Sequence, residues 1–166
     1  MTPDRGVAQV ERRVGLADHA VAREGVIVTL GLGSCVAIVL HDARARVGGL
    51  AHVLLPDPSL SRDGTNDARF PCTAVPLLLS EMRRLGTRDG VTARLVGGAS
   101  MFRSILASTG LNVGERNVVA ARLALEAAGV PLLAEDVGGE HGRSVVFDVA
   151  SGRVTVRSLR AGEREL

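Results

Sequence analysis

Residues 26–56 read VIVTLGLGSCVAIVLHDARARVGGLAHVLLP and hold three apolar, β-branched runs in close succession. Residues 26–30 (VIVTL), 35–40 (CVAIVL) and 49–55 (GLAHVLL) each have the length and composition of a strand. The first two runs are separated by a glycine-rich turn, and the second ends at a His-Asp pair that enters the next turn. This stretch therefore predicts three consecutive strands.

Strands are also predicted further along the chain, at residues 91–96, 144–149 and 154–156. Residues 56–66 (PDPSLSRDGTN) contain Pro, Asp, Ser and Gly without periodicity, which predicts a surface loop. The tail, residues 153–166, is mixed in charge, and we expect it to be a solvated strand followed by a frayed end.

Helices are predicted in the middle of the sequence. Apolar residues in the stretch 69–85 recur mostly at spacings of three and four, which is typical of an amphipathic helix. Pro76 is compatible with that helix only if it lies in the first turn. Residues 117–128 (NVVAARLALEAA) predict a second helix, which the following Gly-Val-Pro ends. A third, shorter helix is predicted over residues 100–108.

The order of these elements predicts the fold class. Strands come first, helices lie in the middle and strands return at the end, so there is no regular β-α-β alternation. We therefore expect an α+β domain with a mixed sheet. A chain of 166 residues has the size of one domain, and we expect a single domain over residues 1–166.

Composition excludes several classes of function. Three Phe and no Trp or Tyr argue against nucleic-acid binding by base stacking, which needs aromatic side chains. A net charge of +2, with basic residues spread along the chain, is too small for electrostatic steering. The histidines and cysteines lack metal-ligand spacing, and the glycines form no nucleotide-binding fingerprint. We therefore expect no nucleic-acid partner, no metal and no cofactor.

The sequence also predicts where the protein works. Its N-terminal stretch lacks the apolar core of a signal peptide, and no apolar run approaches the 18 or so residues of a membrane span. The two cysteines, Cys35 and Cys72, do not make a disulfide framework in a chain of this size. We expect a cytoplasmic protein with free thiols and no membrane insertion.

Three polar residues in the first strands have the chemistry of a thiol hydrolase. Cys35 follows a Gly-Leu-Gly-Ser turn, where the N–H groups of Ser34 and Cys35 can receive an oxyanion. A thiol needs a base to become a good nucleophile. His52 interrupts an otherwise apolar run and can be that base, and the Thr29 hydroxyl can hold its ring in one tautomer.

These residues also have a purely structural interpretation. A single cysteine usually packs as a small hydrophobic residue, threonine is common in strands, and a histidine within a strand is more often a hydrogen-bonded core residue than a catalyst. On the residues alone both interpretations stand. Cys72 lies near a helix start, where the dipole can lower a thiol pKa, but a capping or packing role is the preferred prediction.

The sequence resembles the signature of the chemoreceptor glutamine deamidases (the CheD family) in five segments that follow the family's order. The segments are TLGLGSC (29–35), GGLAHVLLP (48–56), GGASMF (97–102), GERN (114–117) and GGEHGR (138–143). In that family the catalytic Thr precedes the Cys by six positions, and the His follows it by seventeen. The same spacings separate Thr29, Cys35 and His52. The chain departs from the family pattern at Val96, Phe70 and Cys72, all outside this triad.

The resemblance implies a fold, an activity and partners. The fold would be a mixed-sheet β-sandwich flanked by helices, like the catalytic domain of the cytotoxic necrotizing factor toxins. The activity would be deamidation of glutamine side chains on methyl-accepting chemotaxis receptors, through a thioester on Cys35 and without a cofactor. A CheC-type phosphatase is a possible partner. Two alternatives stay open: a thiol amidase or transglutaminase-like enzyme acting on another amide, and a non-enzymatic adaptor that binds receptors or such a phosphatase.

Overall fold

A computed structural model of the chain describes residues 8–100 and 112–166. The described strands are β1 (Glu11–Arg13), β2 (His19–Ala22), β3 (Val26–Leu32), β4 (Val36–Asp42), β5 (Val47–Val53), β6 (Val91–Gly97), β7 (Leu132–Val137), β8 (Arg143–Asp148), β9 (Val154–Ser158) and β10 (Gly162–Glu165). The α-helices within the described residues are α1 (Pro71–Arg84) and α3 (Val113–Ala127), and two short 3-10 turns, η1 (Pro58–Leu60) and η2 (Asp67–Arg69), precede α1.

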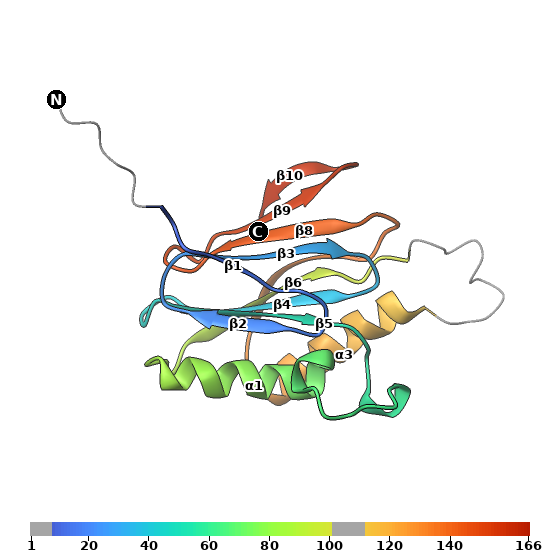
Figure 1. The fold of residues 1–166 in the computed structure, drawn as a ribbon, viewed down its shortest axis with the longest axis horizontal. Helices are drawn as coiled ribbons and strands as arrows, with labels where there is room; N and C mark the ends of the chain where they lie inside the picture. Colours follow the sequence, from blue (N-terminus) through green and yellow to red (C-terminus); the bar gives the residue numbers. More distant parts are fainter. Residues whose placement is uncertain (1–7, 101–111) are drawn as a thin grey trace.

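The strands form two five-stranded sheets that pack face to face, as Figure 1 shows. The first, here called the β3 sheet, has the order β1-β3-β8-β9-β10, and the second, the β4 sheet, has the order β2-β5-β4-β6-β7. Each sheet is mixed, because β1 runs parallel to β3 and β7 runs parallel to β6 while the other pairs are antiparallel. Helix α3 lies between β6 and β7 in the chain, as a parallel pair requires a crossover.

Two apolar cores separate three layers. One core lies between the two sheets and includes Ile27, Leu50 and Phe147. The other lies between the β4 sheet and both helices, and includes Leu78, Leu95 and Leu125. The helices thus cover one outer face of the sandwich (Figure 1). The predicted α+β class and mixed-sheet sandwich are confirmed.

The β4–β5 hairpin is the middle of the molecule. All seven residues of β4 and all seven of β5 are buried, because one face of the hairpin meets the β3 sheet and the other meets the helices. A strand buried on both faces has no polar alternation, which explains the continuous apolar runs in the sequence. Each predicted strand is present, with ends shifted by a few residues; β4 begins at Val36, so Cys35 lies just before it.

Several sequence-based predictions were wrong in detail. Strands β1 and β7 were not predicted, and the tail does not fray, because β10 pairs with β9. The second helix begins at Val113, four residues before its predicted start, with the Asn112 side chain accepting from the Glu115 N–H as an N-cap. The third predicted helix, 100–108, lies outside the described residues except for Ser100, which is not helical.

Pro76 is a further correction. It lies inside α1 and not in its first turn, which Pro71 opens. A proline there leaves the carbonyl of the residue four positions earlier without a helical donor. That residue is Cys72, and both Cys72 and Pro76 are exposed, so water can take the place of the missing N–H. None of the described helices has the length and apolar character needed to cross a membrane.

Candidate active site

A bulge in β3 lies immediately before the predicted nucleophile. Thr29 pairs with Val145 of β8 and the next pair joins Leu32 to Arg143, so β3 makes three steps where β8 makes two. Gly31 within the bulge has a φ of +67°, a left-handed conformation that favours glycine. After the bulge the chain crosses from the β3 sheet to the β4 sheet.

Strand register brings Cys35 and His52 to the same face of the β4 sheet. His52 of β5 lies directly opposite Ala37 of β4. Cys35 precedes Ala37 by two residues, and strand side chains two apart lie on one face. Both Cys35 and Ala37 belong to the core between the two sheets. Cys35 is therefore the diagonal cross-strand neighbour of His52, an arrangement within reach of long and aromatic side chains.

Thr29 and His52 are joined by a hydrogen bond between the two sheets. Thr29 Oγ1 lies 2.7 Å from the carbonyl oxygen of Val14 and 2.7 Å from His52 Nδ1. A carbonyl can only accept, so the hydroxyl proton goes to Val14 and the hydroxyl oxygen must accept from Nδ1–H. The proton of neutral His52 is thereby placed on Nδ1, and Nε2 carries a free lone pair. Within the described part of the chain, this buried Nε2 has no hydrogen-bond partner.

Burial keeps both candidate reacting groups neutral. Thr29 and His52 are each 1% exposed, while Cys35 is 7% exposed, so the thiol lies nearest to solvent. Burial raises the pKa of the Cys35 thiol, an effect that a backbone hydrogen bond partly offsets. Burial also lowers the pKa of His52. Both directions favour a thiol beside a neutral imidazole over a preformed ion pair.

The turn before β4 supplies the predicted oxyanion donors. Ser34 is exposed and Cys35 lies next to it. Across residues 8–100 and 112–166, neither the Ser34 N–H nor the Cys35 N–H donates a hydrogen bond to a backbone or side-chain oxygen. Two adjacent N–H groups that donate to no oxygen of the described chain, the second of which lies against its own thiol, are the arrangement that an oxyanion hole requires.

Sequence reasoning missed one residue that contacts this turn. Asn117 of α3 is fully buried, and its amide Nδ2 donates to the carbonyl oxygens of Ser34 at 2.8 Å and Leu54 at 3.1 Å. A polar residue on the face of α3 that buries Val118, Ala121 and Leu125 is the signal that would have pointed to it.

The remaining predicted candidates lie apart from this site. Cys72 is exposed on α1, and no side chain caps the start of that helix, so the predicted capping role was wrong. The His41-Asp42 pair ends β4 as predicted, and His41 Nε2 contacts the Val149 carbonyl at 2.9 Å. Among the described residues, no group of three His, Cys, Asp or Glu side chains is placed to hold a metal ion.

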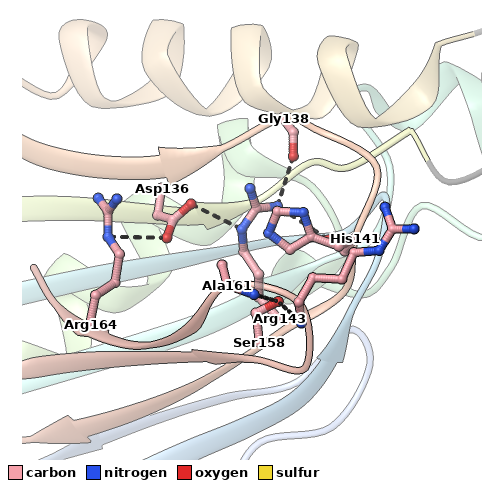
Figure 2. A network of polar contacts seen from close by, with 8 residues as sticks. Asp136, Gly138, His141, Arg143, Ser158, Ala161 and Arg164 are labelled. Atoms are coloured by element: carbon pink, nitrogen blue, oxygen red, sulfur yellow. Dashed lines mark hydrogen bonds and ion pairs between the residues drawn. The ribbon is translucent and has the colours of Figure 1, made fainter.

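Arg143 binds the loop between β7 and β8. Figure 2 shows its side chain among the polar groups of this loop. The guanidinium is 3% exposed and pairs with Asp136 at 3.0 Å, and it also donates to the Gly138 carbonyl at 2.8 Å. A buried charge needs such partners. Because Arg143 pairs with Leu32 at the end of β3, the network supports the strand end that leads into the Cys35 turn.

The chain is similar in sequence to a known protein family. A family model described as "CheD chemotactic sensory transduction" matches residues 54–158. A protein of Geobacter metallireducens named "Probable chemoreceptor glutamine deamidase CheD 2" is 47% identical over 156 residues, which is 92% of this chain and 96% of that one. This chain belongs to the CheD family.

Further CheD relatives span nearly the whole chain. A "Probable chemoreceptor glutamine deamidase CheD" of Desulforamulus reducens is 43% identical and covers 93% of each chain. One of Clostridium botulinum is 40% identical and covers 94% of this chain and 98% of its own. The resemblance inferred from the five motifs is confirmed. The catalytic roles of Thr29, Cys35 and His52 stay predictions.

Proposed function

We propose that this CheD protein is a protein-glutamine deamidase that acts on chemotaxis receptors through Cys35, His52 and Thr29. One observation carries the proposal. The Thr29 hydroxyl donates to the Val14 carbonyl, so it accepts from His52 Nδ1–H and keeps the imidazole proton on that nitrogen. Nε2 is then unprotonated, and it lies on the face of the sheet that Cys35 shares. An orphaned lone pair in the core is costly, and a role as the base for the thiol explains it.

The first half of the reaction forms a thioester. His52 Nε2 takes the Cys35 proton as Sγ attacks the carboxamide carbon of glutamine. The carbonyl oxygen becomes an oxyanion that the N–H groups of Ser34 and Cys35 stabilise. His52 then returns its proton to the amide nitrogen, the C–N bond breaks, and ammonia leaves. The product is a glutamyl thioester on Cys35 with His52 neutral again.

The second half hydrolyses that thioester. Water adds to the thioester carbon while His52 Nε2 takes one of its protons, and the oxyanion forms again at the same N–H groups. When the C–S bond breaks, the proton on His52 goes to Sγ, which restores the thiol and the neutral imidazole. The net reaction is glutamine plus water giving glutamate plus ammonia, and it uses no cofactor.

The burial of the site supports a side-chain amide as the substrate. With Cys35 7% exposed and His52 1% exposed, only a slender group can reach the thiol. A glutamine side chain carries its carboxamide at the end of a flexible apolar stem. The names of the relatives make chemoreceptors the substrate class. Free thiols at Cys35 and Cys72 suit the cytoplasm, where we place the protein.

Two other functions are distinguishable from this one. A transglutaminase-like enzyme would form the same thioester and pass the acyl group to an amine, so its product would keep no free carboxylate. An adaptor, binding receptors or a CheC-type phosphatase, would not need the thiol. A CheC-type partner stays a prediction. If no complex with such a phosphatase forms at high micromolar concentration, the partner prediction is wrong, and the enzyme assignment is unaffected.

The proposal is tested by ammonia release from the cytoplasmic fragment of a chemotaxis receptor. Cys35→Ala and His52→Ala should each abolish release while circular dichroism shows an intact fold. Cys72→Ala is the matched control, since it removes the exposed thiol on α1, and it should keep parental activity. Ammonia release by Cys35→Ala near the parental rate would show that the thiol mechanism is wrong.

A further inference from the structure

We propose that Asn117 is a positioning residue that orients the Ser34–Cys35 peptide unit, so that the Cys35 N–H faces the reacting carbonyl oxygen. The inference rests on the proposed deamidase function and adds a residue to its machinery. Asn117 does not touch the substrate. It acts through the backbone of the turn that carries the nucleophile.

Three successive carbonyl groups of this turn are held from one side. The Ala99 N–H donates to the Gly33 carbonyl oxygen at 2.8 Å, and the Gly98 N–H donates to the Cys35 carbonyl oxygen at 2.8 Å. Between them, Asn117 Nδ2 donates to the Ser34 carbonyl oxygen at 2.8 Å. Two of the donors come from the residues just after β6, and the third comes from α3. The middle carbonyl alone is held by a side chain.

The hydrogen bond from Asn117 to the Ser34 carbonyl fixes the direction in which the Cys35 N–H points. In a trans peptide unit the carbonyl and the N–H point in opposite directions, and no cis bond occurs in the described chain. The Ser34 carbonyl shares its peptide unit with the Cys35 N–H. Because Asn117 holds that carbonyl toward α3, the Cys35 N–H points away from α3, where it donates to no oxygen among the described residues.

The amide of Asn117 can adopt only one useful orientation. Both groups that it contacts, the carbonyl oxygens of Ser34 and Leu54, are acceptors, so Nδ2 must face them. That orientation leaves Oδ1 buried without a partner among the described residues. Such an orphaned acceptor is destabilising, and an apolar residue would suit this helix face better. A requirement for two N–H donors explains why an asparagine stands here.

Asn117 also links the nucleophile to the base. Leu54, its second acceptor, follows His52 by two residues, so one amide ties the Cys35 turn to the end of β5. Close packing fixes the position of α3 itself. A Cβ on Gly114 would lie 2.4 Å from the Ala99 carbonyl oxygen, and one on Gly98 would lie 2.3 Å from Val118 Cγ2. The helix therefore approaches the segment Gly98–Ala99, whose N–H groups donate to the turn, at backbone contact distance.

The test compares reactions that need an oxyanion hole with one that does not. Asn117→Leu keeps the approximate volume and removes the donors, and Asn117→Ala is a second variant that relieves any misfit. Leu125→Ala removes buried apolar volume two turns further along the same helix face, and it is the matched control for general loosening. All variants are made in a Cys72→Ala background, so Cys35 is the one thiol.

Three quantities are measured on each folded variant. These are kcat and KM for deamidation of the receptor fragment, the affinity for a peptide whose target glutamine carries an aldehyde in place of the carboxamide, and the alkylation rate with iodoacetamide. The thiol adds to the aldehyde carbon and forms a tetrahedral thiohemiacetal, whose oxygen occupies the oxyanion position. Alkylation forms a C–S bond and releases iodide, so no oxyanion develops. Only the first two quantities depend on the oriented N–H.

Both Asn117 variants should lower kcat about 10-fold or more with little change in KM, since losing one oxyanion donor outright costs about 100-fold or more. Aldehyde affinity should fall in parallel, and alkylation should stay within about twofold of the parent. Any of four results would overturn the proposal. These are an unchanged kcat, a fall in the alkylation rate as large as that in kcat, the same loss of kcat in Leu125→Ala, and failure of both Asn117 variants to fold. A parent without ammonia release would overturn the deamidase function, while the aldehyde and alkylation comparison would still decide the role of Asn117.

Discussion

Thr29 accepts a hydrogen bond from His52 Nδ1 at 2.7 Å across the two sheets, because its own proton goes to the Val14 carbonyl at 2.7 Å. A neutral hydroxyl does not offset the charge of an imidazolium as a carboxylate does. It selects the tautomer and fixes the ring, and the base is then the nitrogen on the far side of that ring. In the proposed mechanism, this hydrogen bond therefore makes His52 a positioned neutral base.

Thr29 variants test this arrangement. Thr29→Ser keeps the oxygen and should retain most of the activity. Thr29→Val keeps the β-branched shape and loses the hydroxyl, so turnover should fall by about a decade, the equivalent of one neutral hydrogen bond. The fall should be much milder than that of Cys35→Ala in the same ammonia assay. If Thr29→Val turns over as fast as the parent, Thr29 is a strand residue and the site is a Cys–His dyad.

The pH dependence of kcat/KM follows from the two pKa directions. Burial lowers the pKa of His52, so the base stays neutral to a pH below the ordinary imidazole value, and the acid limb should lie below about pH 6.5. Burial raises the pKa of Cys35, so the proton needed by the leaving ammonia is lost only above the ordinary thiol range. A plateau should extend from about pH 6.5 to 8.5.

Two outcomes of that titration would contradict the neutral pair. An acid limb centred above pH 7 would mean that His52 is protonated at rest. A steady rise of kcat/KM through the alkaline range would mean that a free thiolate attacks without help from the imidazole. The Cys72→Ala variant should give the parental profile, because Cys72 lies on α1 and outside the site.

Close packing behind the Cys35 turn makes a prediction on stability. Gly98 and Gly129 have φ values of +66° and +68°, but a Cβ would meet Val118 Cγ2 at 2.3 Å on Gly98 and nothing within 4 Å on Gly129. Gly129→Ala should lower the free energy of unfolding by about 1–2 kcal/mol, the cost of a left-handed residue. Gly98→Ala adds overlap and should lose about 3–5 kcal/mol in urea unfolding. Equal losses of stability in the two variants would show that α3 does not pack tightly against the segment at Gly98.

The sequence alone predicts the parts of this fold in which burial is complete. The β4–β5 hairpin is buried on both faces, so its apolar runs are unbroken and easily read. Strand β7 was missed because an edge strand can carry charges: Glu135 pairs with Arg122, and Asp136 pairs with Arg143. The position of Pro76 was predicted wrongly because it lies on the exposed side of α1, where water can bind the carbonyl that a proline leaves without a donor.

The candidate site follows the same logic. Thr29, Cys35 and His52 stand out as polar or reactive residues in or beside apolar strands, and the family spacing adds to that signal. Asn117 ends the family segment GERN (114–117), but its role cannot be predicted from that segment, because its acceptors Ser34 and Leu54 lie 83 and 63 positions away in the sequence. Only tertiary packing brings α3 against the turn, and no local pattern encodes that contact.

The most direct test of the central claim is peptide mass spectrometry of a receptor cytoplasmic fragment incubated with the protein. Hydrolysis of a glutamine carboxamide replaces NH2 by OH, and the account predicts a gain of about 1 Da at particular glutamines. The gain should be absent with Cys35→Ala and with His52→Ala, and present with Cys72→Ala. Receptor glutamines that keep their mass after incubation with the folded parent, or that gain it equally with Cys35→Ala, would contradict the account.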